Sequence, residues 1–384
     1  MKKIRNIFSK IKLPSLGFTK LFDKLKIIDK YILKRYLVTF SVMLLMFIPI
    51  GIIIDISEKV NKMLENKVPF KEIAWYYLDF TIFFANLLFP IFLFLSIIWF
   101  TSKLANNTEI IAILSSGISF TRFLRPYFIG ATLVSVFTLI MGMYFVPKAS
   151  AGYWNFRYMY LIGGGREEMR DNSDVYRKIS DDEYVFVSST NTEAKMGFNF
   201  SMEKFEGNKL KYKVSANRIM FNPADSTYTL YGFKKRKIGE LNDEIVAAER
   251  KDTILNLDFD NLTPVVYVAE TLPYTELNEF IAKERKRGSK NIDTYLTVFY
   301  KRFAIPISAF ILTIIAVSVS SMKRRGGMGM NLAIGIALAF AFVFFDKIFG
   351  VLASSSSLPP IIAVFIPNII FGILAYYLLR NAKR

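Results

Sequence analysis

Residues 73–117 read IAWYYLDFTIFFANLLFPIFLFLSIIWFTSKLANNTEIIAILSSG. The first part, 73–101, is apolar and aromatic, and as a helix it is long enough to cross the roughly 30 Å hydrocarbon core of a bilayer. Polar residues and a second, shorter apolar run follow directly, and a glycine ends that run. This pattern predicts a membrane span followed by a separate short helix at 106–117.

The short helix has suitable residues at both of its ends. Asn107 or Thr108 can accept a hydrogen bond from a free backbone N–H at the start, and Glu109 suits the positive end of the helix dipole. Gly117 can adopt the left-handed conformation that ends a helix. A helix that binds a partner at the cytoplasmic face of a membrane fits this pattern, and so does a helix that only connects two spans. The apolar residues expected on one side are Ile110, Ile111, Ile113 and Leu114.

Five further stretches pass the same test of length and apolar character. They lie in two groups, so that three spans precede a long insert and three follow it. The sequence therefore predicts an α-helical membrane protein with six transmembrane helices. The other five spans are expected at 37–54, 123–146, 295–320, 331–352 and 361–379.

The distribution of Lys and Arg predicts the orientation of the spans. Basic residues are concentrated before the first span, around the short helix, between the fourth and fifth spans and at the C-terminus. Because basic loops stay in the cytoplasm, both termini are expected to be cytoplasmic and the insert to lie across the membrane. The net charge of +18 then reflects topology rather than nucleic-acid binding. The expected divisions are a basic segment at 1–36, spans at 37–146, the inserted domain at 147–294 and spans at 295–384.

Within the insert, apolar residues recur with a period of two instead of the helical period. Several short strands, separated by turn residues such as Gly207 and Asn208, predict an antiparallel all-β domain, either a sandwich or a partly open barrel. Such a domain can bind lipid in a groove, accept another protein's strand at its edge or serve only as a structural unit. A helix at 273–287 is expected to lead back to the membrane. The expected strands are 183–187, 198–202, 209–214, 227–231 and 254–259.

The composition excludes most familiar catalytic chemistry. The chain contains neither Cys nor His, which removes thiol nucleophiles, disulfides, imidazole bases and the usual zinc ligands. The sequence has no G-x-x-x-x-G-K-[ST] phosphate loop. We therefore expect no enzymatic activity, no nucleotide-binding site, no cofactor and no metal.

Four segments, in order and around the β insert, carry a family resemblance. They are similar to segments of the LptF/LptG (YjgP/YjgQ) family of lipopolysaccharide-export permeases, and the chain resembles this family over nearly its whole length. The end of the chain resembles the LptG-like branch, whereas the long basic N-terminal segment departs from the family pattern. The four segments are IDKYILKRYL at 28–37, NTEIIAILSSG at 107–117, YKRFAIP at 300–306 and LPPII at 358–362, the last followed by Pro367.

The resemblance implies a permease of the bacterial inner membrane with a periplasmic β-jellyroll, which extracts lipopolysaccharide and passes it to a periplasmic bridge. The implied partners are a second LptF/LptG-like permease, an LptB-like ATPase dimer and an LptC-like periplasmic protein. In this family the segment matching 108–117 is a coupling helix that enters a groove on the ATPase. The residues implied in this contact are Glu109, Ile110, Ile113, Leu114 and Gly117.

Several ionisable residues lie within or near the outer halves of the predicted spans, where charges are costly and usually pair or face a cavity. In a lipopolysaccharide permease, their cations would bind the phosphorylated glucosamines of lipid A, and the planar fork of Arg suits phosphate well. Lysines and arginines that merely extend to the membrane surface beside neutralising acids are the simpler interpretation. The candidates are Lys59, Lys62, Asp79, Lys301, Arg302, Asp346 and Lys347.

Two other functions fit the same sequence features. The first is an ABC permease for lipoprotein release or for another glycolipid, although lipoprotein-release permeases usually have four spans. The second is a membrane-anchored periplasmic scaffold that transports nothing. A scaffold would not need the helix at 106–117 to bind an ATPase, so the substitution Glu109→Arg would leave it working.

Overall fold

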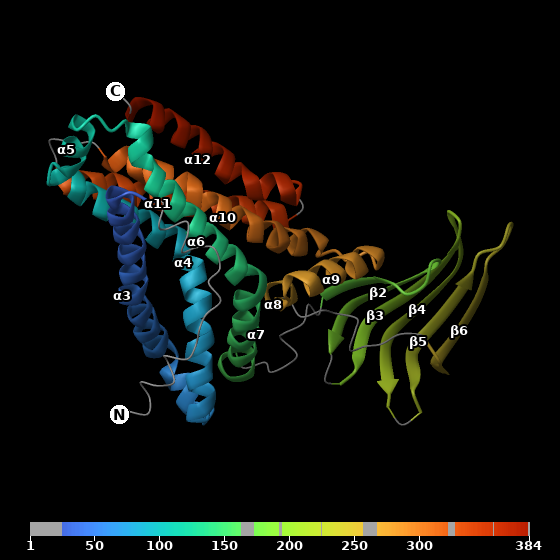
Figure 1. Ribbon diagram of the computed structural model, residues 1–384. Coiled ribbons are helices and arrows are strands. Elements are labelled where there is room, and N and C mark those ends of the chain that lie inside the picture. The colour runs from blue at the N-terminus through green and yellow to red at the C-terminus, as the bar shows by residue number, and fades with distance from the viewer. Residues whose placement is uncertain are drawn as a thin grey trace, which may run out of the picture.

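The computed structural model describes residues 25–162, 173–191, 194–223, 225–255, 267–321, 327–355 and 357–382. It contains a bundle of long helices and a β-sheet, with two shorter helices between them (Figure 1). Six helices, counted within these residues, are long and apolar enough to cross a membrane. The predicted helical membrane protein with an inserted all-β domain is confirmed.

The third span is much longer than its apolar residues predict. The helix continues past Val146 as far as Leu161, through two π-helical turns named η1 and η2. Pro147 does not end it, because the proline directly follows η1, and a local π-helical adjustment of this kind lets a membrane helix accommodate a proline. Residues 147–161 therefore belong to the bundle and not to the β domain. The first half of the bundle consists of α3 (Ile27–Glu65), α4 (Phe70–Asn106), α5 (Glu109–Ser115), α6 (Phe120–Ile140), η1 (Met141–Phe145), α7 (Val146–Phe156) and η2 (Arg157–Leu161).

The second half of the bundle has α10 at its centre. This helix packs against α4, α6, α11 and α12, and 61% of its most apolar stretch is buried, compared with 11% for α3. Small buried side chains such as Ser308, Ala309 and Ala316 allow neighbouring helices to approach closely. The bounds are α10 (Ile292–Ser320), α11 (Gly327–Ser354) and α12 (Pro360–Ala382).

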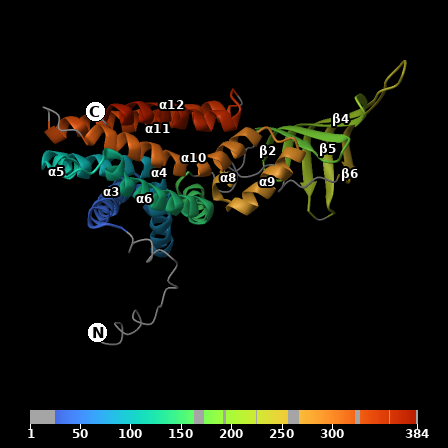
Figure 2. The same ribbon diagram turned by 45° about the horizontal axis from the view of Figure 1, so that its top comes forward.

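Two short helices connect the sheet to α10. They are α8 (Val268–Thr271) and α9 (Tyr274–Lys286), and the second confirms the helix predicted at 273–287. Figure 2 shows both helices between α10 and the strands. We call the end of the bundle beside α8 and α9 the sheet end, and the opposite end, which carries α5, the α5 end.

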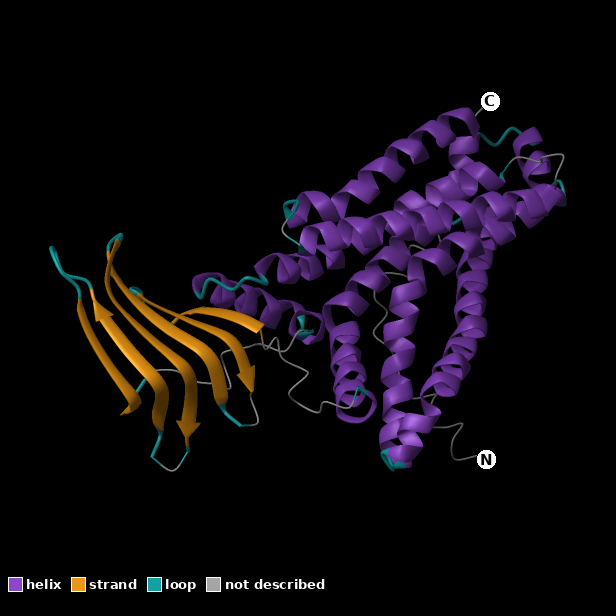
Figure 3. Ribbon diagram, turned by 180° about the vertical axis from the view of Figure 1, so that it is seen from behind, coloured by secondary structure: helices purple, strands orange, loops and turns teal. Residues whose placement is uncertain are grey.

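The described strands form one curved antiparallel sheet (Figure 3). Each strand pairs with the next one along the chain, so these residues form a single layer rather than the two packed sheets of a sandwich. The first and last strands were not predicted, and the strand expected at 254–259 lies mostly outside the described residues. The bounds are β1 (Ser173–Lys178), β2 (Glu183–Asn191), β3 (Met196–Glu206), β4 (Lys209–Asn222), β5 (Thr227–Lys237) and β6 (Glu244–Thr253).

The middle of the sheet is irregular. The paired residues skip Asn199, Asn217 and Gly232, and two of these have a left-handed backbone, with φ of 52° at Asn199 and 66° at Gly232. A Cβ atom at Gly232 would lie 2.7 Å from the Asn217 side chain, so glycine leaves the necessary room. The irregularity shifts the alternation of side chains. Val214 and Ile219 consequently share one hydrophobic core although they are five residues apart in β4.

Candidate functional site

A cavity of about 510 Å³ lies at the sheet end of the bundle, between α4, α7, α10, α11 and α12. Phe83, Pro90 and Phe342 contribute to its apolar wall. Charged side chains reach the cavity from η2, α8, α10 and α11, so segments far apart in the sequence meet here. These charged residues are Arg157, Glu270, Lys301, Arg302, Asp346 and Lys347.

Four of the residues predicted from the sequence come together in this cavity. The ammonium group of Lys301 donates to Asp346 Oδ2 over 3.1 Å, which neutralises both side chains. A Cβ atom at Gly350 would lie 2.8 Å from Lys301 Nζ, so the glycine provides space for this lysine on the facing helix. Lys347 is exposed and forms no ion pair with the described residues. Lys347 therefore offers the cavity an unneutralised cation.

Arg302, the fourth of these residues, is buried and only partly satisfied. Its Nη2 donates to the backbone oxygens of Ala269 and Leu272, over 3.1 and 2.7 Å. Its Nη1 is buried without a hydrogen-bond partner among the described residues. Leaving a buried, charged donor unpaired is costly. Arg302 thus holds the end of α8 with one nitrogen and can offer the other to an anion in the cavity.

The sequence did not predict the contribution of α7, η2 and α8. The Arg157 guanidinium donates to the Tyr153 hydroxyl and lies 5.3 and 5.4 Å from the ring centroids of Tyr153 and Trp154. Trp154 in turn donates to Glu270 Oε2 over 3.0 Å. Arg157 was not predicted because it falls within the segment expected to belong to the β domain. Extending the third span past Pro147 would have placed Arg157 in a membrane helix, where a charged residue indicates a functional site.

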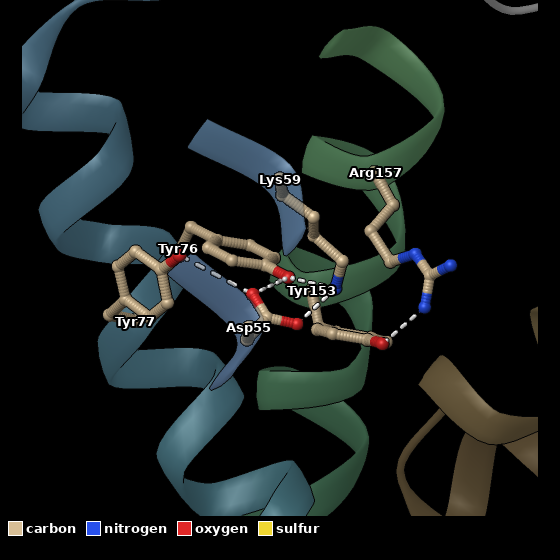
Figure 4. A network of polar contacts seen from close by, with 6 residues as sticks. All are labelled: Asp55, Lys59, Tyr76, Tyr77, Tyr153 and Arg157. Atoms are coloured by element: carbon tan, nitrogen blue, oxygen red, sulfur yellow. Dashed lines mark hydrogen bonds and ion pairs between the residues drawn. The ribbon is translucent and has the colours of Figure 1, made fainter. Parts of the chain in front are cut away.

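The structure places Lys59 and Lys62 outside the cavity. In Figure 4, Lys59 forms an ion pair with the buried Asp55, which also accepts hydrogen bonds from Tyr76 over 3.0 Å and Tyr77 over 3.3 Å. Lys62 donates to the backbone oxygen of Leu161 over 3.1 Å. Lys59 also donates to the Tyr76 hydroxyl of α4 over 3.2 Å, so both lysines join α3 to neighbouring helices. The spacing of Asp55 and Lys59, four residues apart on one helix, could have predicted their pairing.

Asp79 also lies away from the cavity. It is half-buried on α4 and faces α7 at Gly152, where an added Cβ atom would lie 1.8 Å from Asp79 Oδ2. The two helices approach closely at this point only because residue 152 lacks a side chain. Asp79 neutralises neither Lys301 nor Arg302 by a described contact.

A second group of predicted residues lies at the α5 end. Ile110 is buried, and Ile113 and Leu114 pack against the core of the bundle, but Ile111 is 52% exposed. The expectation that all four apolar residues share one side is therefore wrong for Ile111. Gly117 has a φ of 85°, as expected for a residue that ends a helix.

The predicted cap of α5 is absent. Thr108 occupies the capping position with a left-handed backbone, at φ 60°, and its side chain makes no capping hydrogen bond. Asn107 instead donates to Glu109 Oε1 over 3.3 Å, and the Tyr31 hydroxyl donates to Glu109 Oε2 over 2.8 Å. The start of α5 is thus held through the carboxylate of Glu109, which remains half-exposed.

Nearly the whole chain is similar to a known family of membrane proteins. The family model described as lipopolysaccharide export system permease LptF/LptG matches residues 30–381. This match covers all six spans and the inserted sheet. No curated protein matches the chain. Within the described residues, no group of three or more acidic side chains is close enough to hold a metal ion.

Proposed function

The chain belongs to the LptF/LptG family of lipopolysaccharide export permeases, and from this premise we propose that it takes lipopolysaccharide from the inner membrane through the cavity at the sheet end. A separate ATPase drives the transfer, and the β domain receives the lipid on the periplasmic side. The α5 end and both chain termini are then cytoplasmic.

The observation that carries the proposal is the free Nη1 of Arg302 beside the cation of Lys347 in one cavity. Phosphate groups of a glycolipid accept charge-assisted hydrogen bonds from both residue types. Apolar side chains such as Phe83 and Phe342 line the same cavity, which suits the first carbons of acyl chains. A phosphorylated lipid matches this mixture of charge and apolar wall better than a purely polar or purely apolar cargo does.

The half-exposed Glu109 supports an ATPase contact at the α5 end. Its carboxylate can accept a further hydrogen bond from a cationic side chain of a docked protein, because an ionised carboxylate has about four acceptor positions. Ile111 and Ala112 are exposed beside it and can add apolar contact. We assign this surface to an LptB-like ATPase dimer, with a second LptF/LptG-like permease completing the transporter.

The edge of the sheet supports a periplasmic partner. All residues of β6 except Thr253 are exposed, and β6 pairs only with β5 among the described strands. Its free edge can accept a strand from another β domain. We assign it to an LptC-like protein that continues the periplasmic bridge.

The experiment that tests the proposal is affinity purification of the complex in detergent, followed by mass spectrometry of its proteins and lipids. We expect an ATPase, a second six-span permease and bound lipopolysaccharide. Lys347→Gln should reduce the bound lipid about tenfold, since one charge-assisted contact is lost. Lys148→Gln is the matched control, because Lys148 is an exposed lysine of α7 that does not line the cavity.

Each part of the proposal can fail separately. Glu109→Arg should remove the ATPase and leave the bound lipid. Retention of the ATPase in this variant would refute the contact at α5. Equal lipid loss in the Lys347 and Lys148 variants would refute the cavity as the headgroup site. Purification of the chain without glycolipid or ATPase would favour the scaffold function.

A further inference from the structure

The first turns of α3 meet α5 through one polar contact. The Tyr31 hydroxyl donates a 2.8 Å hydrogen bond to Glu109 Oε2, although the two residues are 78 positions apart. The guanidinium of Arg35, one turn further along α3, lies 4.9 Å from the centre of the Tyr31 ring. The carboxylate at the start of α5 is therefore held by a different transmembrane helix as well as by its own loop.

The same part of α3 is anchored to α6. Both carboxylate oxygens of the buried Asp29 lie 2.6 Å from the two terminal nitrogens of Arg122, in a bidentate ion pair. Asp29 also accepts a 3.2 Å hydrogen bond from the backbone N–H of Lys26. Because α5 lies between α4 and α6 in the chain, Asp29 fixes α3 to the helix that follows α5, and Tyr31 fixes α3 to α5 itself.

Few other polar contacts restrain α5. Thr108 gives it no side-chain cap, and Gly117 ends it after seven residues. Its remaining anchor is apolar, through Ile110 and its partly buried neighbours. Apolar packing resists separation but is not directional. The shorter hydrogen bond from Tyr31, together with the 3.3 Å one from Asn107, therefore sets the direction in which the Glu109 carboxylate points.

The opposite end of α3 is also held by polar contacts. Asp55 accepts hydrogen bonds from Tyr76 and Tyr77 of α4, and Asn66 donates to the backbone oxygen of Tyr160 over 2.6 Å. Tyr76 stacks on Phe156 of α7 with ring centroids 4.3 Å apart. Since α4 and α7 both line the cavity, a displacement at the start of α3 can reach the cavity wall through this network.

We infer that Tyr31 is a positioning residue that aims the Glu109 carboxylate and joins movement of α5 to the start of α3. This inference rests on the proposed docking of a cationic surface of the ATPase at Glu109. The carboxylate can bind that cation and keep Tyr31, because it has acceptor positions for both. Removing the Tyr31 hydroxyl should then leave docking largely intact and interrupt the transfer of motion.

The test uses the complete transporter in proteoliposomes and the variant Tyr31→Phe, which keeps the ring and loses only the hydroxyl. Tyr376→Phe is the matched control, because Tyr376 is an exposed tyrosine of α12 without a hydrogen bond to the described residues. Since the chain contains no Cys, a single cysteine at the exposed Leu45 can carry a fluorescent label that reports the position of α3. ATPase affinity, lipid released per ATP and the nucleotide-dependent change in fluorescence are measured together.

We expect Tyr31→Phe to change ATPase affinity by less than about threefold and to lower lipid released per ATP by about tenfold, the loss of one charge-assisted hydrogen bond. The nucleotide-dependent change at Leu45 should disappear, and Tyr376→Phe should behave as wild type. The effect of Tyr31→Phe should also be smaller in a Glu109→Gln background, because the amide oxygen accepts only a weaker, uncharged hydrogen bond from the Tyr31 hydroxyl.

Normal release and a normal fluorescence change in Tyr31→Phe would overturn the role of Tyr31. If Glu109→Arg still removed the ATPase in that case, the proposed docking would stand. Retention of the ATPase in Glu109→Arg would instead refute the docking itself. A Tyr31→Phe variant that lost thermal stability together with ATPase binding would show that Tyr31 serves packing and not coupling.

Discussion

The sheet is joined to the helices by a buried ion pair whose removal has a calculable effect. Arg177 Nη1 of β1 lies 2.6 Å from Glu284 Oε2 of α9, with the two residues 7% and 1% exposed. Arg287 approaches the other oxygen of Glu284 at 3.4 Å, and the backbone N–H of Lys178 donates to the Arg287 oxygen over 3.1 Å. Most of the charge compensation of Glu284 therefore comes from Arg177.

The substitution Arg177→Met would leave Glu284 buried with only a weak partner. Breaking a buried ion pair on one side costs about 3–5 kcal/mol. Arg287 is half-exposed and already within reach, so we expect the lower end, about 3 kcal/mol. Replacing both residues, as in Arg177→Met with Glu284→Leu, should restore most of the loss, because apolar replacement of a buried pair is close to neutral.

Hydrogen exchange measures this loss where it occurs. An opening free energy lower by about 3 kcal/mol corresponds to amide exchange roughly 100-fold faster, and the increase should be confined to β1 and α9. Lys211→Met is the control, since it removes an exposed pair with Glu206 and should leave exchange unchanged within about twofold. Wild-type exchange in Arg177→Met, or a double variant as unstable as the single one, would refute the reasoning.

Three further predictions concern single residues. Gly152→Ala should destabilise the bundle by about 1–3 kcal/mol, because the added Cβ would overlap the Asp79 side chain. Gly142→Ala is the control, since a Cβ atom there would meet open space, and thermal unfolding of both variants measures the difference. Gly117→Val should weaken ATPase binding in a titration, because a φ of 85° is strained for a β-branched residue. Burial raises the pKa of Tyr267 to about 12 from its ordinary 10, so the unfolded chain ionises first as pH rises. Folding stability should therefore fall less steeply between pH 10 and 12 in Tyr267→Phe than in the wild type, as pH-dependent unfolding would reveal.

The sequence predicted the spans well because the thickness of a bilayer sets a clear length requirement. It underestimated the helices because polar residues at their ends lie outside the apolar windows. α3 begins at Ile27, ten residues before the predicted 37, and ends at Glu65 instead of 54. The third helix passes Pro147 because that proline directly follows the π-helical turn η1, which adjusts the backbone there.

The strands were predicted where one face is apolar and missed where neither face is. β6 contains EIVAAERKDT, in which charged residues outnumber buried ones, and only its pairing with β5 reveals it as a strand. β1 is short, and Val175 is its one buried residue in the apolar core of the sheet. Such strands depend on hydrogen bonds to a neighbour, and these long-range contacts leave little trace in local sequence.

The contacts of the site residues, like those of the edge strands, could not be predicted from local sequence. Their positions in the sequence marked Lys59, Lys62, Lys301 and Lys347 as cations within or near the spans. Their partners make them different, since Asp55 neutralises Lys59, Asp346 neutralises Lys301 and a backbone oxygen accepts from Lys62. Of these four lysines, only Lys347 both lines the cavity and lacks an ion pair within the described ranges.

This distribution of charge suits a transporter better than a storage site. A cavity with every cation free would bind a phosphorylated lipid tightly and release it slowly, since each charge-assisted hydrogen bond adds to the affinity. Here Asp346 competes for Lys301, and the backbone oxygens of α8 occupy one nitrogen of Arg302. Lys347, Arg157 and the free nitrogen of Arg302 remain to attract the headgroup. In the proposed function, movement of α8 or α11 would change how much of the remaining charge is available, and a cargo that must leave again requires a site of this kind.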